Sequence, residues 1–200
     1  MSIDLDVYAV RCPKDLRVRW EQAFADCGMI CEFRPDFDPH SWTGGDLVAK
    51  LQASPKGFPE APLYGDQPFI AGCGMDIAPS PEFKEELEDV LARCPRALQG
   101  KLKKAKSHFF FTTSMGRAPE AWRFQVFAAA TLAKVSDGLL YDPQSAVFHT
   151  GTDAVKLAAD EAASMDMECA RRLKTGKYLN LRRFRSWATA LKNTIPEYAE

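Results

Sequence analysis

The chain has 200 residues, of which 46% are hydrophobic and 26% are charged, and this composition excludes an intrinsically disordered protein. The formal net charge of -1 argues against a protein whose whole surface binds nucleic acid. We expect one α+β domain over residues 1–200, with a core over about 1–150 and a helical C-terminal extension over about 151–200.

Charge is distributed unevenly along this nearly neutral chain. Residues 1–66 carry 11 acidic and 7 basic side chains, whereas residues 171–200 carry 2 acidic and 8 basic ones. The N-terminus has no signal-peptide pattern, and the longest apolar run, residues 124–133, is too short to span a membrane. We therefore expect a soluble cytoplasmic protein with no membrane partner.

The six cysteines form no CxxC pair and no zinc-like spacing. In a cytoplasmic chain they are expected to be reduced and to fill apolar positions. The sequence also lacks the glycine-rich nucleotide motifs, the H-E-x-x-H zinc motif and the G-x-S-x-G nucleophile motif. We expect no metal and no cofactor.

Alternating apolar and polar residues predict a first strand over 3–9. Pro13 is placed as the first residue of a helix that Gly28 ends, and residues 29–33 read as a second strand. The next stretch, 35–68, holds six of the thirteen prolines. It is expected to be an irregular loop, interrupted by one short helix near Asp46–Ala53.

The second half alternates clear strand and helix patterns. Strands are predicted over 68–75 and 108–113, with a helix between them that Ser80 and Pro81 begin and Pro95 breaks. A buried helix over 119–136, a hairpin turning at Asp142–Ser145, a helix from Thr152 or Asp153 to Leu173 and a last helix over 179–192 follow. The first four strands and two helices have the order of a split β-α-β, ferredoxin-like core.

The stretch RPDFDPHSWTGGD, residues 34–46, is the most unusual in composition. Its carboxylates and histidine allow a metal or catalytic site, its prolines and aspartates allow simple turn and cap chemistry, and its tryptophan allows partner contact. A calcium loop beginning at Asp36 requires glycine at the sixth position and glutamate at the twelfth. Ser41 and Leu47 stand there, so this metal pattern fails.

Two other functional hypotheses remain open. A small hydrolase-type enzyme would use Cys73, within GCGM, together with His149 and Asp142, although no local motif supports this set. A regulatory or nucleic-acid-binding module would instead use the basic tail, whose aromatic residues lie between its cations. These residues are Arg171, Arg172, Lys174, Lys177, Tyr178, Arg182, Arg183, Phe184, Arg185 and Trp187. A solvated helix face, or a contact with an acidic protein, explains the same tail.

The succession of AWRFQVFAAATLAKVSDG, GLLYDPQSAVFHTG and a helix with an acidic start resembles small α+β proteins of bacterial toxin–immunity loci. These include immunity proteins of type VI secretion and related polymorphic toxin systems. The resemblance covers residues 109–165 and transfers no functional residue to a numbered position. It implies a non-catalytic inhibitor that binds one cognate toxin, such as a nuclease.

An acidic, aromatic loop is also what a binder of a basic cleft requires, because carboxylates can take the place of phosphates. Tyrosine and tryptophan are frequent anchors of protein interfaces. We therefore predict a partner-binding surface formed by Asp36, Asp38, Trp42, Asp46, Tyr64 and Asp66.

Overall fold

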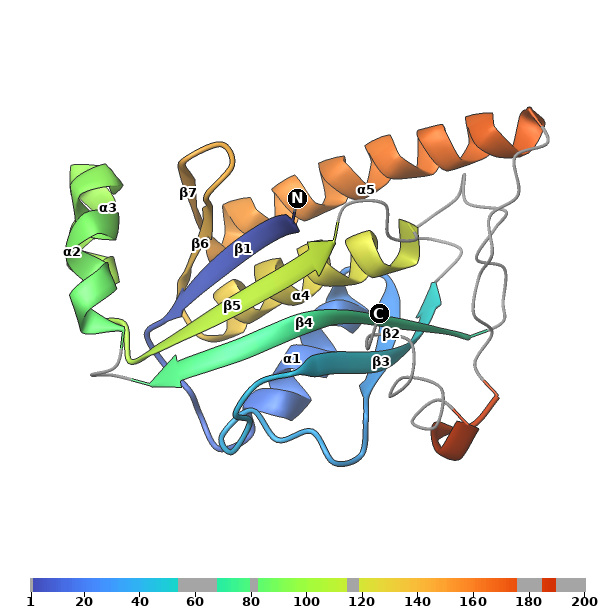
Figure 1. Cartoon of the computed structure of the whole chain (residues 1–200), viewed down its shortest axis with the longest axis horizontal. Helices are drawn as coiled ribbons and strands as arrows, with labels where there is room; N and C mark the ends of the chain where they lie inside the picture. Colours follow the sequence, from blue (N-terminus) through green and yellow to red (C-terminus); the bar gives the residue numbers. More distant parts are fainter. Residues whose placement is uncertain (1, 54–67, 80–82, 115–118, 176–184, 190–200) are drawn as a thin grey trace.

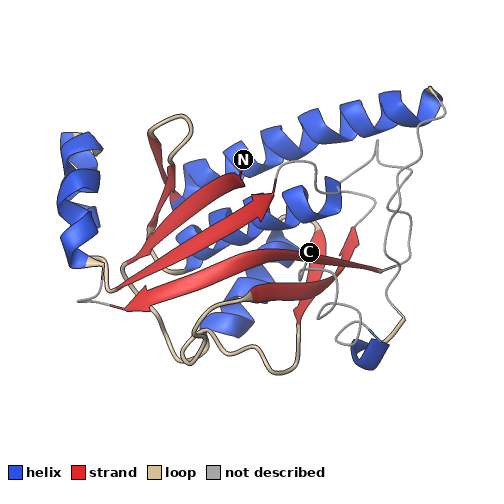
Figure 2. Cartoon of the chain, viewed as in Figure 1, coloured by secondary structure: helices blue, strands red, loops and turns tan. Residues whose placement is uncertain are grey.

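In a computed structural model of the chain, the residues described are 2–53, 68–79, 83–114, 119–175 and 185–189. They form an open seven-stranded sheet with helices packed on both of its faces (Figures 1 and 2). The elements are β1 (Ser2–Ala9), α1 (Leu16–Asp26), β2 (Met29–Phe33), β3 (Asp46–Ala53), β4 (Phe69–Pro79), α2 (Lys84–Arg93), α3 (Arg96–Leu102), β5 (Ser107–Ser114), α4 (Pro119–Val135), β6 (Leu139–Asp142), β7 (Val147–Thr150) and α5 (Gly151–Lys174).

The strand order is β2-β3-β4-β5-β1-β6-β7, and every neighbouring pair is antiparallel. The α+β class is therefore confirmed, but the split β-α-β order is not. The two strands that α1 connects, β1 and β2, are separated by β3, β4 and β5. The N-terminal strand thus pairs with β5 along its whole length, from Ser2 opposite Ser114 to Ala9 opposite Ser107.

The prediction of a short helix near Asp46–Ala53 is wrong, because these residues form strand β3. Leu47, Ala49 and Leu51 alternate along it and are all buried on the face toward the core. Leucine, alanine, lysine and glutamine favour helices in isolation, yet β3 pairs with β2 on one side and with β4 on the other. Tertiary pairing therefore overrides local propensity here.

The main hydrophobic core lies between one face of the sheet, called the inner face here, and helices α1, α4 and α5. In Figure 1 these helices lie behind the sheet. Trp20, fully buried on α1, packs against Phe33 and Phe111 at ring-centroid distances of 4.8 Å and 6.2 Å. Aromatic residues of this size supply much of the apolar area that stabilises a domain.

Helix α4 is buried on nearly all sides, as its sequence predicts, and its buried Gln125 and Thr131 side chains are hydrogen-bonded. Gln125 donates to the carbonyls of Ile3 and Phe111 at 2.8 Å and 3.1 Å and accepts from the Thr113 hydroxyl at 2.6 Å. These bonds fix α4 against β1 and β5.

The opposite face, called the outer sheet face, is covered at one end by α2 and α3. A second apolar cluster lies there, formed by Tyr8, Phe83, Cys94, Leu102, Leu139, Tyr141 and Phe148. The strands toward β2 lie beyond these two helices (Figure 1). The described helices thus cover the two sheet faces unequally.

The predicted hairpin and the helix that follows it are confirmed as β6, β7 and α5. Helix α1 begins at Leu16 rather than at Pro13, whose carbonyl instead accepts from the Leu16 N–H at 2.9 Å. Ser80 and Pro81, and most of the predicted helix over 179–192, lie outside the described residues. Within the described residues, no helix is both long enough and apolar enough to cross a membrane.

Candidate partner-binding surface

The loop from Arg34 to Gly45 joins β2 to β3, and two of its aromatic residues attach it to the core. Phe37 is 1% exposed and packs against Phe33 at 5.1 Å and against Trp42 at 5.3 Å. The Trp42 indole N–H donates to the Met75 carbonyl of β4 at 2.9 Å. Two aromatic side chains therefore attach the loop to the core.

Arg17 of α1 also holds the loop, through hydrogen bonds to its backbone. Its guanidinium donates to the carbonyls of Phe33, Pro35 and Phe37 at 2.9 Å, 3.3 Å and 2.8 Å. Glu21, one helical turn away, pairs with Arg17 at 3.3 Å and accepts from the Phe33 N–H at 3.0 Å. The planar arginine fork suits this task because its donors have a fixed geometry.

The loop ends in two glycines with positive φ, Gly44 at +124° and Gly45 at +115°. A Cβ atom added at Gly44 would stand 2.2 Å from a carboxylate oxygen of Asp76. Gly45 accepts from the Met75 N–H at 2.8 Å, which connects the end of the loop to β4. Only glycine fits this conformation and this close approach without strain.

The two aspartates of the loop are exposed and held in place. The Arg34 guanidinium binds both carboxylate oxygens of Asp36, at 2.7 Å and 2.6 Å, and this hydrogen bonding lowers the pKa of Asp36. The backbone N–H of His40 and the Ser41 hydroxyl, both at 3.0 Å, lower the pKa of Asp38. Both carboxylates are therefore anionic at neutral pH.

These contacts match the turn chemistry that was one of the three interpretations of the loop. Its helix-cap part is wrong, because Asp46 begins a strand. His40 contacts the Pro13 carbonyl at 3.0 Å. Among the described residues, no group of three or more histidine, cysteine, aspartate or glutamate side chains could hold a metal ion.

Asp46 belongs to a row of residues that crosses the outer sheet face. Asp46 pairs with Gly74, Gly74 with Thr112, and Thr112 with Asp4. The next row brings Asp76, Phe110 and Asp6 together in the same way. We call the carboxylates of these rows, Asp4, Asp6, Asp46 and Asp76, the acidic face. Asp6 is buried, at 7% exposed, whereas the other three reach solvent.

Two side chains on the outer sheet face, His108 and Thr112, contact carboxylates of the acidic face. His108 Nε2 lies 2.6 Å from a carboxylate oxygen of Asp6, and the Thr112 hydroxyl donates to Asp4 at 2.8 Å. The His108 ring is stacked on Tyr8 at 4.7 Å, which fixes its orientation. Asp76 is exposed, and it lies next to the loop at Gly44. The loop and the acidic face are therefore one continuous surface.

The predicted partner residues Asp36, Asp38, Trp42 and Asp46 all belong to this surface, whereas Tyr64 and Asp66 lie outside the described residues. Sequence reasoning missed Asp4, Asp6 and Asp76. Their only signal was a polar residue at alternate positions of a strand, which marks an outward direction but not a shared site.

The alternative enzymatic set is not brought together. Cys73 is 1% exposed in the inner-face core on β4, and His149 lies on β7, four strands away in the sheet, or roughly 19 Å. The Asp142 carboxylate accepts from the backbone N–H of Gln144 at 2.9 Å and from the Ser145 hydroxyl at 2.7 Å. It thus serves the turn of the hairpin.

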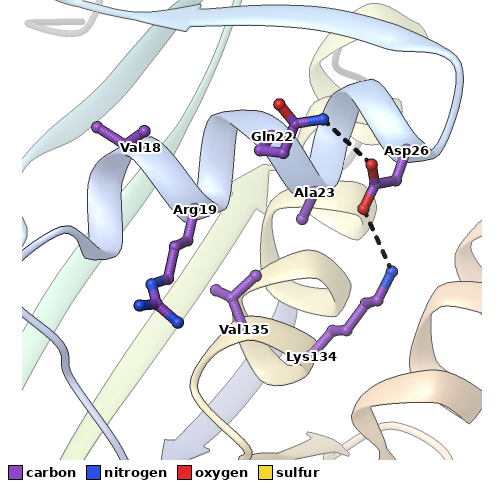
Figure 3. A pocket seen from close by; sticks show the side chains of 7 residues that line it. All are labelled: Val18, Arg19, Gln22, Ala23, Asp26, Lys134 and Val135. Carbon is purple, nitrogen blue, oxygen red and sulfur yellow. Dashed lines mark hydrogen bonds and ion pairs between the residues drawn. The ribbon is translucent and has the colours of Figure 1, made fainter.

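A surface pocket of about 510 Å³ lies between α1 and α4 (Figure 3). Its charges are matched internally, because Asp26 lies 3.7 Å from Lys134 and Arg19 lies 2.8 Å from Asp15. Gln22 also donates to Asp26, at 3.2 Å. The pocket presents no unpaired charge that would select a ligand.

In comparisons with known proteins, no family profile, no curated protein and no solved structure matches the chain. The surface must therefore be interpreted from its own chemistry.

Proposed function

We propose that the chain is a non-catalytic binding protein that presents the 34–46 loop and the adjoining acidic face to a basic surface of a protein partner. The observation that carries this proposal is the fixed loop, whose exposed Asp36 and Asp38 are anionic while Phe37, Trp42 and Arg17 hold its backbone. A binding loop ordered before contact loses little conformational entropy when the partner arrives.

The chemistry of this surface favours a cationic partner. Carboxylates on a positioned loop can occupy sites where a basic protein would otherwise hold phosphates, and opposite charges accelerate association. Trp42 adds an aromatic residue of the kind that anchors many interfaces, although its indole N–H is already bonded to Met75. The expected contact is therefore polar and charged, with an aromatic centre.

Within this class, the resemblance of residues 109–165 to proteins of toxin–immunity loci favours an immunity protein. In this proposal the chain acts in the cytoplasm, where it binds one cognate bacterial toxin and blocks it. A nuclease is the toxin class that the acidic surface fits best, because its active site is built to hold phosphates. The separation of Cys73 from His149 speaks against the enzymatic alternative.

The test is to co-express the chain with the protein encoded beside it and to measure both co-purification and cell survival. A complex that survives gel filtration, together with rescue of cells from the neighbouring protein's toxicity, is the expected result. If the neighbouring protein neither binds nor is neutralised, the immunity function is wrong.

A further inference from the structure

A run of basic side chains that the proposed function does not use lies at one end of the sheet. Residues 90–110 carry six basic and no acidic side chains. Three of these cations, Lys103, Lys104 and Lys106, are exposed on the short link between α3 and β5. The Lys106 N–H donates to the Ala9 carbonyl at 2.8 Å, which fixes this link to the end of β1 (Figure 1).

Asp137, in the turn after α4, brings two further cations to this link. Lys101 Nζ lies 2.7 Å from one of its carboxylate oxygens, and Arg11 Nε lies 4.0 Å from the other. The hydrogen bond from Lys101 lowers the pKa of Asp137, and the charges of Lys101, Arg11 and Lys104 lower it further. These three cations therefore surround one carboxylate. We call Arg11, Lys101, Lys103, Lys104 and Lys106 the basic patch.

The basic patch is strongly positive, because its five cations face a single carboxylate. Within the described part of the chain, Lys103, Lys104 and Lys106 form no ion pair. The dipole of α3 explains a cation in its last turn, where Lys101 lies. It does not explain Arg11 and Lys106, which lie outside that helix. A surface of this kind attracts polyanions.

The composition of the basic patch favours a phosphate backbone over a protein or a membrane. Protein interfaces are depleted in lysine and have aromatic or apolar centres, whereas the patch has four lysines and no aromatic residue. Single-stranded nucleic acid is held largely by stacking on aromatic rings, so the charge-dense duplex fits better. Membrane-surface segments insert apolar side chains. The exposed large apolar side chains among the described residues belong to other elements: Val18, Ile30, Val147 and Met167.

The acidic face limits where such a ligand can lie. Its row of Asp6 and Asp76 is three residues, or roughly 10 Å, from the strand ends at Ala9 and Ser107, where the patch begins. Phosphates are attracted by one of these surfaces and repelled by the other. A bound polyanion is therefore confined to this end of the sheet, away from the 34–46 loop.

We propose that the basic patch binds the phosphate backbone of double-stranded nucleic acid without reading its sequence. Lysine and arginine contacts to phosphates position a protein on a duplex but carry no sequence information. The inference goes beyond the proposed function, because it adds a second surface whose occupant has the opposite charge. The two surfaces are separate, so each can be tested while the other is intact.

The patch is tested by fluorescence anisotropy of a labelled duplex of about 20 base pairs, titrated with the full chain at several salt concentrations. Each phosphate contact contributes about -0.9 to the slope of log K against log salt concentration, so we expect a slope of roughly -4. Lys103→Gln with Lys104→Gln should weaken binding roughly tenfold and reduce the slope by about 2. Lys156→Gln with Arg185→Gln removes two exposed cations elsewhere and should change affinity less than about twofold.

Asp137→Asn should act in the opposite direction. It removes the one carboxylate of the patch, so binding should tighten roughly threefold. Asparagine tolerates the left-handed backbone of this residue, at φ +50°, so the turn is kept. A gain of affinity cannot come from damage to the fold.

Three results would overturn the inference: no binding at low salt, equal losses in the two double-lysine-and-arginine variants, or no gain in Asp137→Asn. A decaglutamate peptide that competes as well as unlabelled duplex would assign the patch to an acidic protein and would also overturn it. Asp36→Lys with Asp38→Lys should not weaken duplex binding. Because that variant is the one that tests the loop, failure of the patch and failure of the proposed function are distinguishable.

Discussion

At the scale of single residues, Gln125 makes three side-chain hydrogen bonds inside the core. Its amide serves two strand carbonyls and the Thr113 hydroxyl while it is fully buried. Gln125→Leu would remove these three hydrogen bonds and leave the buried Thr113 hydroxyl without its acceptor, and a buried unsatisfied group costs about 1–3 kcal/mol. We expect a loss of about 2–4 kcal/mol in the free energy of unfolding, measured by urea denaturation. Thr113→Val, which removes one donor, should cost less; equal losses would show that packing rather than hydrogen bonding decides.

Gly44 is the position in the loop where the backbone conformation requires a glycine. A side chain at φ +124° is strained, and a Cβ there overlaps the Asp76 carboxylate. We expect Gly44→Ala to destabilise the protein by about 1–3 kcal/mol in thermal or urea unfolding. Gly45→Ala is the matched control, because its φ is similar and its nearest neighbour lies 3.9 Å away. If both substitutions cost the same, the overlap with Asp76 has no effect.

The loop carboxylates also predict a pH dependence. Because the folded state lowers the pKa of Asp36 and Asp38, their contribution to stability is present above the unfolded pKa, about 3.9 for aspartate. It is lost as the pH falls through the lower folded values. The stability difference between the natural chain and Asp36→Asn with Asp38→Asn should therefore be constant from neutral pH to about 5 and shrink below about 4. A difference unchanged at pH 3 would contradict this assignment.

At the scale of elements, most strands and helices follow from sequence periodicity. The exception is β3, which the sequence led us to predict as a short helix. The alternation of Leu47, Ala49 and Leu51 was present, but helix-favouring residues and the surrounding prolines concealed it. What makes 46–53 a strand is the pairing with β2 on one side and β4 on the other. These partner strands lie about 20 residues away in the sequence, and no pattern within residues 46–53 indicates which strands they pair with. The same long-range pairing places β5 between β4 and β1, which a count of elements cannot give.

Strand β2 lies at an edge of the sheet, where an unpaired backbone invites aggregation. Arg17 and Glu21 of α1 satisfy the Phe33 carbonyl and N–H at this edge. We expect Arg17→Met to destabilise the protein by about 1–2 kcal/mol and to raise hydrogen exchange in the 34–45 loop. Glu21→Gln, which keeps an acceptor for the Phe33 N–H, should have a smaller effect. Unchanged loop exchange in Arg17→Met would show that Phe37 and Trp42 alone hold the loop.

At the scale of the whole molecule, the candidate site was only partly visible in the sequence. The 34–46 loop was recognisable because its composition is unusual over a short stretch. The acidic face was not, because Asp4, Asp46 and Asp76 come from three strands that only the sheet order brings together. The hydrogen bond from the Trp187 indole to Glu32 was equally hidden, because 155 positions of sequence separate the two residues.

The central claim is that the loop carboxylates bind a basic partner, and charge reversal tests it most directly. Calorimetric titration with the co-encoded protein would compare Asp36→Lys with Asp38→Lys against Asp160→Lys with Glu161→Lys. The second pair makes the same charge change at exposed positions of α5. Circular dichroism and the unfolding midpoint of each variant would establish that the fold is retained. We predict at least a tenfold loss of affinity for the loop variant and less than threefold for the α5 variant. Equal affinities of the two variants would contradict the proposed surface.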